Sequence, residues 1–310
     1  MSVRAAALPV PLLRPGGGAA FRRWTERESV FSWLMIVPPL LFLMALVGYP
    51  FVYGIWLSLQ DRPVAHAGTF VGLRNFVTNA HDPVFWQVAR NTFVYTFCAT
   101  VLKAVGGLGM ALVMNQVFPA KNIIRAIMLL PFIVPTVLST VAWMWILDPS
   151  FSVVNWAMFQ MGFPKPGPAW LGNPYLAMFS LIMINTWRGL PFYGITLLAG
   201  LQTIPPDLHE AAVIDGAGSW ARFRYITLPL LMPVIFIVTL FSVIFTFSDF
   251  QLVYVLTRGG PANATHLFAT YAFDIAMSAG QFGLGASVAL AMLPALAVVI
   301  MGLAFYMRSR

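Results

Sequence analysis

Charged residues are scarce in this sequence. Asp, Glu, Lys and Arg together make up 9% of its 310 residues, whereas soluble domains average about 25%. Hydrophobic residues account for 59%. A soluble chain of this length cannot bury so much apolar surface in one core, because a large share of its residues must face water. The shortage of charge therefore excludes a soluble globular protein and predicts an integral membrane protein.

The residues and motifs of several kinds of functional site are also missing. Cys98 is the single cysteine and lies in an apolar run, so neither a disulfide nor a cysteine metal site is predicted. The sequence contains no G-x-x-x-x-G-K-[ST] phosphate loop, no H-E-x-x-H zinc motif and no Ser, His and Asp arrangement typical of hydrolases. We therefore expect no enzyme activity, no metal and no cofactor in this chain.

Acidic residues are fewer than basic ones, and the formal net charge is +8. Nucleic-acid-binding proteins gather such an excess in a basic patch with interleaved aromatic residues. This sequence places it in tails and connecting loops instead. A nucleic-acid partner is therefore not expected.

Six long apolar runs alternate with loops rich in turn residues or charge. About 20 apolar residues suffice to cross a bilayer as a helix. The runs predict an all-α integral membrane protein, with a tail over residues 1–29 and a single six-helix domain over residues 30–310. The spans are expected near residues 31–58, 91–117, 126–147, 176–201, 230–256 and 284–307, and residues 257–283 are expected to form a loop with a short amphipathic segment.

Lys and Arg residues outside the spans predict the orientation. Eleven lie in the two tails, in the 118–125 link and in the segment between the fourth and fifth spans, and five lie in the opposite loops. Cytoplasmic loops carry the excess of positive charge in membrane proteins. We therefore expect both termini and that segment on the cytoplasmic side, with lipid surrounding the spans.

The segment between the fourth and fifth spans is a polar elbow over residues 206–224. The residues Pro205–Asp207 favour the end of one helix and the first turn of the next. Ala211 and Ala212 give the new helix a small-residue surface that another protein can approach closely. Gly216 favours its end, since glycine readily adopts the left-handed conformation that closes a helix.

The same elbow resembles the EAA loop of bacterial ABC importer permeases. That loop has the pattern EAA, then DGA three residues on, then phenylalanine, isoleucine and L-P-x-L-x-P. The resemblance extends over most of the chain from Phe31 onward. Within the loop the matching residues are Glu210, Ala211, Ala212, Asp215, Gly216, Ala217, Phe223, Ile226, Leu228, Pro229, Leu231 and Pro233.

The resemblance implies a type I ABC importer permease fold with a coupling loop over residues 203–228. It also implies the partners: a second homologous permease subunit, two ATPase subunits that bind ATP and Mg²⁺, and an extracytoplasmic substrate-binding protein, at the bacterial cytoplasmic (inner) membrane. Glu210 and Asp215 can instead act as local helix caps, and both roles can hold together. The ATPase-coupling residues that the resemblance implies are Glu210, Ala211, Ala212, Asp215, Gly216 and Ala217.

Three charged residues lie inside predicted spans: Lys103, Arg188 and Asp249. A charge at bilayer depth costs about 2.5–3.5 kcal/mol on insertion scales and usually faces a cavity or a partner. Lys103 can line the transport path, or it can pair with a carbonyl or a neighbouring subunit. Arg188 belongs to the segment NTWRGLPF, whose Gly189 and Pro191 predict a break in the fourth span. Broken helices of this kind often line substrate sites.

The segments around Arg188 and Asp249 resemble the sugar-contacting segments of the larger maltose-importer permease subunit. Ser242, Phe245, Thr246 and Asp249 follow the spacing i, i+3, i+4, i+7, which predicts one helical face. The alternative is a polar seam between helices that includes an Arg188–Asp249 ion pair. The substrate contacts that the resemblance implies are Asn185, Arg188, Gly189, Phe192, Ser242, Phe245, Thr246 and Asp249.

The sequence also departs from the maltose pattern. Arg188 and Asp249 replace less charged positions, so the solute is not expected to be read in the same way. The loop after the first span lacks the large additional domain of that subunit. The stretch LTRGGPANAT (Leu256–Thr265) resembles the LT-x-GGP loop of carbohydrate permeases, which favours sugars over amino acids, peptides or metals.

These observations predict the permease subunit of an ABC importer. It would move a sugar or sugar-like solute, such as an oligosaccharide, a polyol or a sugar derivative, into the cytoplasm by alternating access. A second hypothesis is an ion-coupled carrier that uses Arg188, Asp249 and Lys103 as a relay. A third is a membrane receptor or scaffold without transport.

Overall fold

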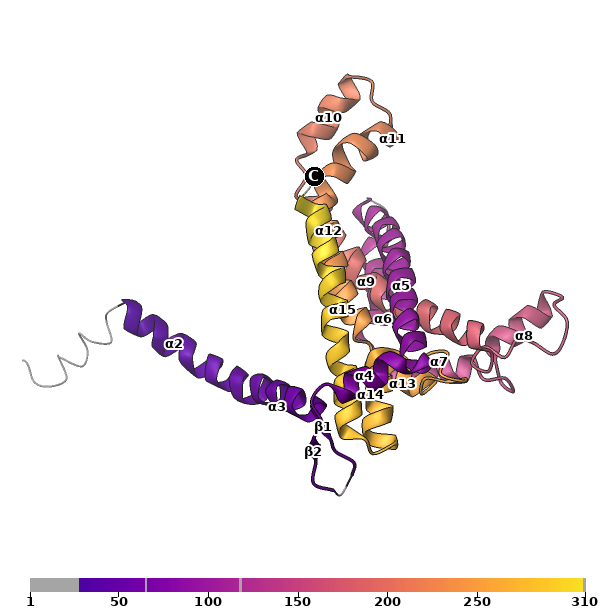
Figure 1. The fold of residues 1–310 in the computed structure, drawn as a ribbon. Helices are drawn as coiled ribbons and strands as arrows, with labels where there is room; N and C mark the ends of the chain where they lie inside the picture. Colours follow the sequence, from indigo (N-terminus) through magenta and orange to yellow (C-terminus); the bar gives the residue numbers. More distant parts are fainter. Residues whose placement is uncertain (1–27, 65, 117–118, 309–310) are drawn as a thin grey trace, which may run out of the picture. The chain divides into compact units, whose positions relative to one another are not determined.

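The chain is described by a computed structural model over residues 28–64, 66–116 and 119–308. The predicted tail over residues 1–29 lies almost wholly outside the described residues. Residues up to Gly54 and residues from Ile55 form two units, and each is described by itself. The described residues are mostly helical (Figure 1). This agrees with the predicted all-α class, apart from a small antiparallel pair of two-residue strands, β1 (Gln60–Asp61) and β2 (Thr69–Phe70).

The helices follow one another with short connections. The first unit holds α2 (Glu28–Leu43), the π-helical turn η1 (Met44–Gly48) and the start of α3 (Tyr49–Ser58). The second unit contains α4 (Arg74–His81), α5 (Pro83–Asn115), α6 (Lys121–Ile133), α7 (Thr136–Ile146), α8 (Val153–Gln160), α9 (Pro174–Gln202), α10 (Pro206–Ile214), α11 (Ser219–Arg222), η2 (Phe223–Thr227), α12 (Leu228–Phe247), α13 (Gln251–Leu256), α14 (Phe268–Phe273), η3 (Asp274–Ser278) and α15 (Phe282–Arg308).

Several of these helices are suited to crossing a membrane. Within the described residues, four segments are long and apolar enough, and they are Ser32–Ser58, Pro83–Asn115, Ser219–Phe247 and Phe282–Phe305. The bent pair of α6 and α7 makes a fifth if it is counted as one span. The chain is therefore a multi-pass membrane protein. The 29-residue helix α9 occupies the predicted fourth span but is not among these five, so the total of six spans stays a prediction.

Helix breaks lie elsewhere than the sequence predicts. The predicted third span is broken at Val134–Pro135, where α6 and α7 meet at 94°. The predicted fifth span does not continue to residue 256, because α12 ends at Phe247 and α13 is a separate helix. The break expected at Gly189 and Pro191 is wrong, since α9 runs through both residues. Pro191 removes one backbone N–H, and a span packed among other helices tolerates that loss.

Two glycines allow α5 and α9 to pack closely along their length. A Cβ at Gly107 of α5 would overlap the side chain of Tyr193 on α9, and a Cβ at Gly194 of α9 would lie 2.7 Å from the sulfur of Met110. Tyr193 is fully buried in this contact. The close approach places the middle of α5, including Lys103, directly beside the middle of α9.

The segment between α13 and α14 is held by a buried histidine. The His266 ring is in contact with Gly259. Glycine suits this position for two reasons: its φ is +84°, and a Cβ there would overlap the ring. His266 Nδ1 lies 3.2 Å from the hydroxyl of Thr270. Burial lowers the pKa of His266 below its ordinary value, and the negative charge of Asp274 opposes part of that shift.

We expect this segment to lose stability in mild acid. Because the pKa of His266 is lower in the folded chain than in the unfolded chain, its stabilising contribution is complete above an ordinary histidine pKa of about 6.5. It is lost as the pH falls below that value, where only the unfolded chain gains the proton. The thermal unfolding midpoint of the purified protein should therefore decrease when the pH is lowered from about 7.5 to about 5.5.

The His266→Gln variant tests the cause, because it cannot take up the proton and should show a smaller fall. His81 is exposed, so His81→Gln should keep the pH dependence of the parent protein. An equal fall in the parent and in His266→Gln contradicts the assignment.

Candidate functional site

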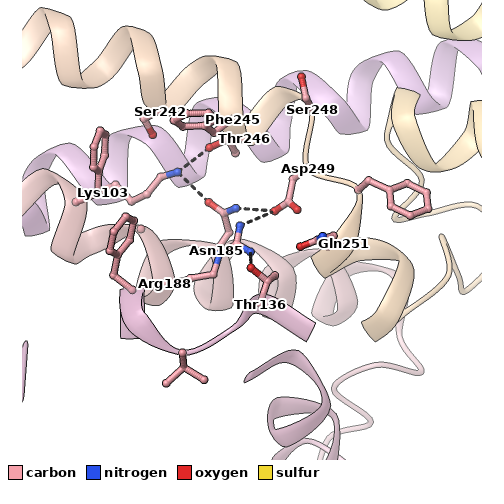
Figure 2. A pocket seen from close by; sticks show the side chains of 15 residues that line it. Lys103, Thr136, Asn185, Arg188, Ser242, Phe245, Thr246, Ser248, Asp249 and Gln251 are labelled. Carbon is pink, nitrogen blue, oxygen red and sulfur yellow. Dashed lines mark hydrogen bonds and ion pairs between the residues drawn. The ribbon is translucent and has the colours of Figure 1, made fainter. Parts of the chain in front are cut away.

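One cavity of about 440 Å³ lies where α5, α6, α9 and α12 meet (Figure 2). All eight residues that the sequence implicates in substrate contact line it. Their arrangement around one cavity is thus a property of the fold, while their contact with a substrate stays a prediction. The lining also includes seven residues that the prediction does not contain, namely Lys103, Phe132, Val134, Thr136, Ser248, Phe250 and Gln251.

Asp249 lies in the break between α12 and α13 and is buried, with 6% of its surface exposed. Its Oδ2 accepts hydrogen bonds from the Tyr95 hydroxyl and from Asn185 Nδ2, each at 2.8 Å. Its Oδ1 accepts one from the backbone N–H of Leu252, at 3.4 Å, in the first turn of α13. Of the four residues expected on one helical face, Ser242, Phe245 and Thr246 lie on α12, whereas Asp249 lies after the end of that helix. Asp249 reaches the cavity from the break, where its carboxylate accepts a hydrogen bond from the first turn of α13.

Arg188 forms the predicted ion pair with Asp249, and it also lines the cavity. Its Nη2 is 3.4 Å from Asp249 Oδ2, and its Nη1 donates a 2.9 Å hydrogen bond to Thr136 Oγ1. Thr136 is the first residue of α7, directly after the 94° bend. The guanidinium therefore connects both helix breaks to the continuous helix α9. The Arg188 side chain remains 23% exposed and has further N–H groups that face the cavity.

Lys103 and Asp249 lie on opposite sides of Asn185 (Figure 2). Its ammonium donates hydrogen bonds to Asn185 Oδ1 at 2.9 Å and to Thr246 Oγ1 at 2.7 Å. The Asn185 amide is thus held at both ends, by Lys103 on its oxygen and by Asp249 on its nitrogen. These contacts place Lys103 in the hydrogen-bonded network at the cavity, while its part in a transport path stays a prediction.

Gly189 has a role that the sequence does not reveal. A Cβ at this position would lie 2.5 Å from Cδ of Lys103. The missing side chain therefore makes room for the lysine stem, and Gly189 shapes the cavity through Lys103.

Aromatic rings form the apolar part of the lining. The rings of Phe132 and Phe192 are stacked with centroids 6.1 Å apart, and Phe245 is 65% exposed. The cavity therefore combines flat apolar faces with hydroxyl, amide, carboxylate and cationic groups. Such a surface suits a polar solute that also has apolar C–H faces. Among the described residues, no group of three or more His, Cys, Asp and Glu side chains could hold a metal ion.

Some lining residues leave no signal in the sequence. Phe132 and Thr136 come from the bent α6–α7 pair, and Phe250 and Gln251 follow the break after α12. Tyr95 is not a lining residue, but its hydroxyl donates a hydrogen bond to Asp249, which is one. The bend and the break bring the first four residues to the cavity, and only the contact with Asp249 identifies Tyr95.

The elbow contains the predicted short helix as α10, and a second short helix, α11, follows it at one end of the helix bundle (Figure 1). Gly216 has a φ of +80°, and the N–H of Ala217 donates to the carbonyl of Ala212 at 2.8 Å, which closes α10. Glu210 and Asp215 are exposed, and neither carboxylate has a hydrogen-bond partner among the described residues. Both are therefore available to another protein.

Comparison with known proteins identifies the family. The family model described as "Binding-protein-dependent transport system inner membrane component" matches residues 103–309. The chain belongs to this family. Its matched region contains Lys103, α9, the elbow and α12, so the cavity and the elbow are parts of a transport permease.

Relatives of this permease are similar over most of their length. It is 36% identical to the trehalose/maltose transport system permease protein MalF of Thermococcus litoralis, over 85% of this chain and 89% of that protein. It is 32% identical to the sulfoquinovosyl glycerol transport system permease protein SmoG of Agrobacterium fabrum, over 87% and 89%. A solved bacterial ABC transporter that imports alginate contains a chain of the same fold, with a TM-score of 0.80, 20% identity and coverage of 94% and 99%.

The Gly189→Ala variant of this permease tests whether Gly189 makes room for the Lys103 side chain. The added methyl group must displace the lysine stem, which disturbs the hydrogen bonds to Asn185 and Thr246. Overpacking of this kind costs about 1–3 kcal/mol. We expect a lower thermal unfolding midpoint and a loss of solute uptake of about tenfold, as for one lost hydrogen bond to a charged group.

Gly109→Ala is the matched control. Gly109 also lies inside a span, in α5, but nothing lies within 4 Å of a Cβ built there. This variant should keep uptake and stability, since alanine favours helix more than glycine does. Equal behaviour of the two variants contradicts the role of Gly189.

Proposed function

We propose that this permease is one transmembrane subunit of an ATP-driven ABC importer that moves a sugar or sugar-like solute into the cytoplasm by alternating access. One observation carries the proposal: the elbow directly connects α9 and the Ser219–Phe247 segment, two of the helical segments that line the cavity. α9 ends at Gln202 and α10 begins at Pro206, and the helical segment after the elbow, Ser219–Phe247, runs to the break that holds Asp249.

This connection supports a mechanical role for the elbow. A partner that moves α10 and α11 must also move the ends of α9 and of the Ser219–Phe247 segment. Asn185 and Arg188 lie on the first, and Ser242 and Thr246 lie on the second. Movement at the elbow therefore changes the cavity itself, as alternating access requires.

The surface of the elbow suits a tightly docked partner. Ala211, Asp215 and Gly216 are exposed, while Ala212 and Ala217 are partly exposed. Larger apolar side chains surround them, with Ile214 87% and Trp220 73% exposed. Small residues beside such anchors favour close packing against a cleft, and the carboxylates of Glu210 and Asp215 can pair with cations there. We propose that ATPase subunits dock here and that ATP and Mg²⁺ are bound and used on those subunits.

The solute class rests on the cavity and on the relatives. Hydroxyl, amide and carboxylate groups next to aromatic faces match the alternating O–H and C–H surface of a sugar. MalF and SmoG are named for trehalose/maltose and for sulfoquinovosyl glycerol, and DasB of Streptomyces coelicolor, 29% identical over 94% of this chain and 90% of that protein, is named for diacetylchitobiose. These names support a carbohydrate or carbohydrate derivative.

We propose two further partners. A second homologous permease subunit completes the pore, and an extracytoplasmic binding protein delivers the solute. A solved alginate transporter chain with a TM-score of 0.78 to this one is described in complex with an alginate pentasaccharide-bound periplasmic protein. We propose the cytoplasmic membrane as the location, with both termini and the elbow on the cytoplasmic side.

An ion-coupled carrier is the second candidate, because Lys103, Asn185, Asp249 and Arg188 form one continuous hydrogen-bonded chain. Sugar uptake into vesicles that contain this chain alone, driven by an ion gradient without ATP, favours the carrier. Uptake that requires ATP and the partner subunits favours the importer.

The elbow itself is tested by Gly216→Ala. Its φ of +80° is left-handed, and a residue with a side chain pays about 1–2 kcal/mol in that conformation. The strain should reshape the turn between α10 and α11. We expect ATP-driven uptake to fall about tenfold, in line with that energy, while ATP hydrolysis by the complex loses its dependence on solute.

Gly218→Ala provides the control. Gly218 lies in the same turn, but its φ is −67° and nothing lies within 4 Å of a Cβ built there. It should transport normally. Normal uptake by Gly216→Ala, or an equal loss in both variants, contradicts the proposed coupling.

A further inference from the structure

The charges that line the cavity do not balance. Among the 15 lining residues, Lys103 and Arg188 are cationic and Asp249 is the single carboxylate. The remaining residues are neutral. An uncompensated charge at bilayer depth is costly, so such a charge usually meets a partner or a ligand of opposite sign.

Arg188 and Asp249 account for each other. Their side chains form an ion pair at 3.4 Å. The carboxylate also accepts hydrogen bonds from Tyr95, Asn185 and the backbone of Leu252. Four donors therefore surround Asp249, and little capacity remains for a direct bond to another cation.

Lys103 is the cation that is left over. It is 4% exposed, and both of its hydrogen-bond acceptors are neutral oxygens, from Asn185 and Thr246. Within the described part of the chain it has no ion-pair partner. An ammonium group has three N–H donors, so one remains for a further acceptor. The cavity is the space beside this group.

We infer that the cavity accepts a solute that carries an anionic group on a hydroxylated body, and that Lys103 selects for this group. The chemistry is that of a carboxylate, sulfonate or phosphate oxygen, which accepts the third hydrogen of Lys103. The partly exposed guanidinium of Arg188 adds donors from α9. The aromatic faces of Phe192 and Phe245 remain for the C–H surface of the solute. The inference rests on the proposed function, because it names the class of solute moved.

Arg188 is the other cation of the cavity, and the contacts of the two side chains favour Lys103 as the group that recognises the anion. Arg188 pairs directly with a carboxylate, whereas Lys103 contacts only neutral oxygens among the described residues. Gly189 is consistent with this assignment, since its missing side chain is what allows the lysine stem to reach the cavity.

The test uses the transporter purified with its partner subunits through a tag on this chain, without the external binding protein. Leaving out that protein isolates the selectivity of the cavity. The probes are matched sets based on glucose, galactose and mannose. Each set holds a neutral disaccharide, the uronic acid in which one CH₂OH group is oxidised to a carboxylate, and the methyl ester of that acid, which has a similar shape but no charge.

Binding is measured by calorimetry. In at least one set we expect the acid to bind at least about tenfold more tightly than both its ester and the neutral disaccharide, the ratio expected for one charge-assisted hydrogen bond. Lys103→Met keeps the length of the stem without the charge, and it should reduce the ratio to about one. Lys165→Met removes a lysine from the segment between α8 and α9, outside the cavity, and should leave the ratio unchanged.

The outcomes separate the inference from the proposed function. A complex that binds no acid, or that prefers the neutral members, overturns the inference, as does a preference for acids that Lys103→Met retains. If Lys103→Met fails to assemble, the ratio of acid to ester in the unmodified complex decides. ATP-driven uptake in proteoliposomes is measured in parallel with the complete transporter. Its presence with neutral sugars alone refutes the inference and preserves the proposed function, whereas its absence with every sugar refutes the proposed function.

Discussion

A buried carboxylate organises this permease. In the sequence, Asp249 lies directly after an apolar helix that is suited to cross a membrane. A buried charge there is stable only if hydrogen-bond donors replace water. Its donors come from three helices: Tyr95 on α5, Asn185 and Arg188 on α9, and the first turn of α13. Each of these helices must therefore keep its position relative to the others. The donors approach Asp249 from several directions, and the cavity lies beside the carboxylate that they surround.

Both helix breaks lie beside the same network of polar side chains. Where α12 ends, freed backbone groups need partners, and the Asp249 carboxylate supplies one by accepting from Leu252. Where α6 bends into α7, Arg188 donates to Thr136 at the first residue of the new helix. One break thus has a backbone N–H bound by Asp249, and the other has the Thr136 hydroxyl bound by Arg188 of α9. Both breaks therefore lie next to polar groups that line the cavity.

The elbow is connected to the cavity through the chain. It lies between α9 and the Ser219–Phe247 segment in the chain, and both supply cavity residues. Its own carboxylates, Glu210 and Asp215, face outward without partners among the described residues. The buried charged side chains Lys103 and Asp249 thus lie at the cavity, whereas the carboxylates of Glu210 and Asp215 are exposed.

Much of this architecture was accessible from the sequence alone. The scarcity of charge, the apolar runs and the EAA pattern established a multi-pass permease and the position of its elbow, because hydropathy and turn residues act over short stretches of chain. Spacing and resemblance also identified eight residues that do line one cavity. Only the tertiary structure decided where the helices break, that Lys103 belongs to the cavity and that Gly189 makes room for it. Those features depend on contacts such as that between α5 and α9, where residues distant in sequence compete for the same space and the same hydrogen bonds, and no local pattern records the result.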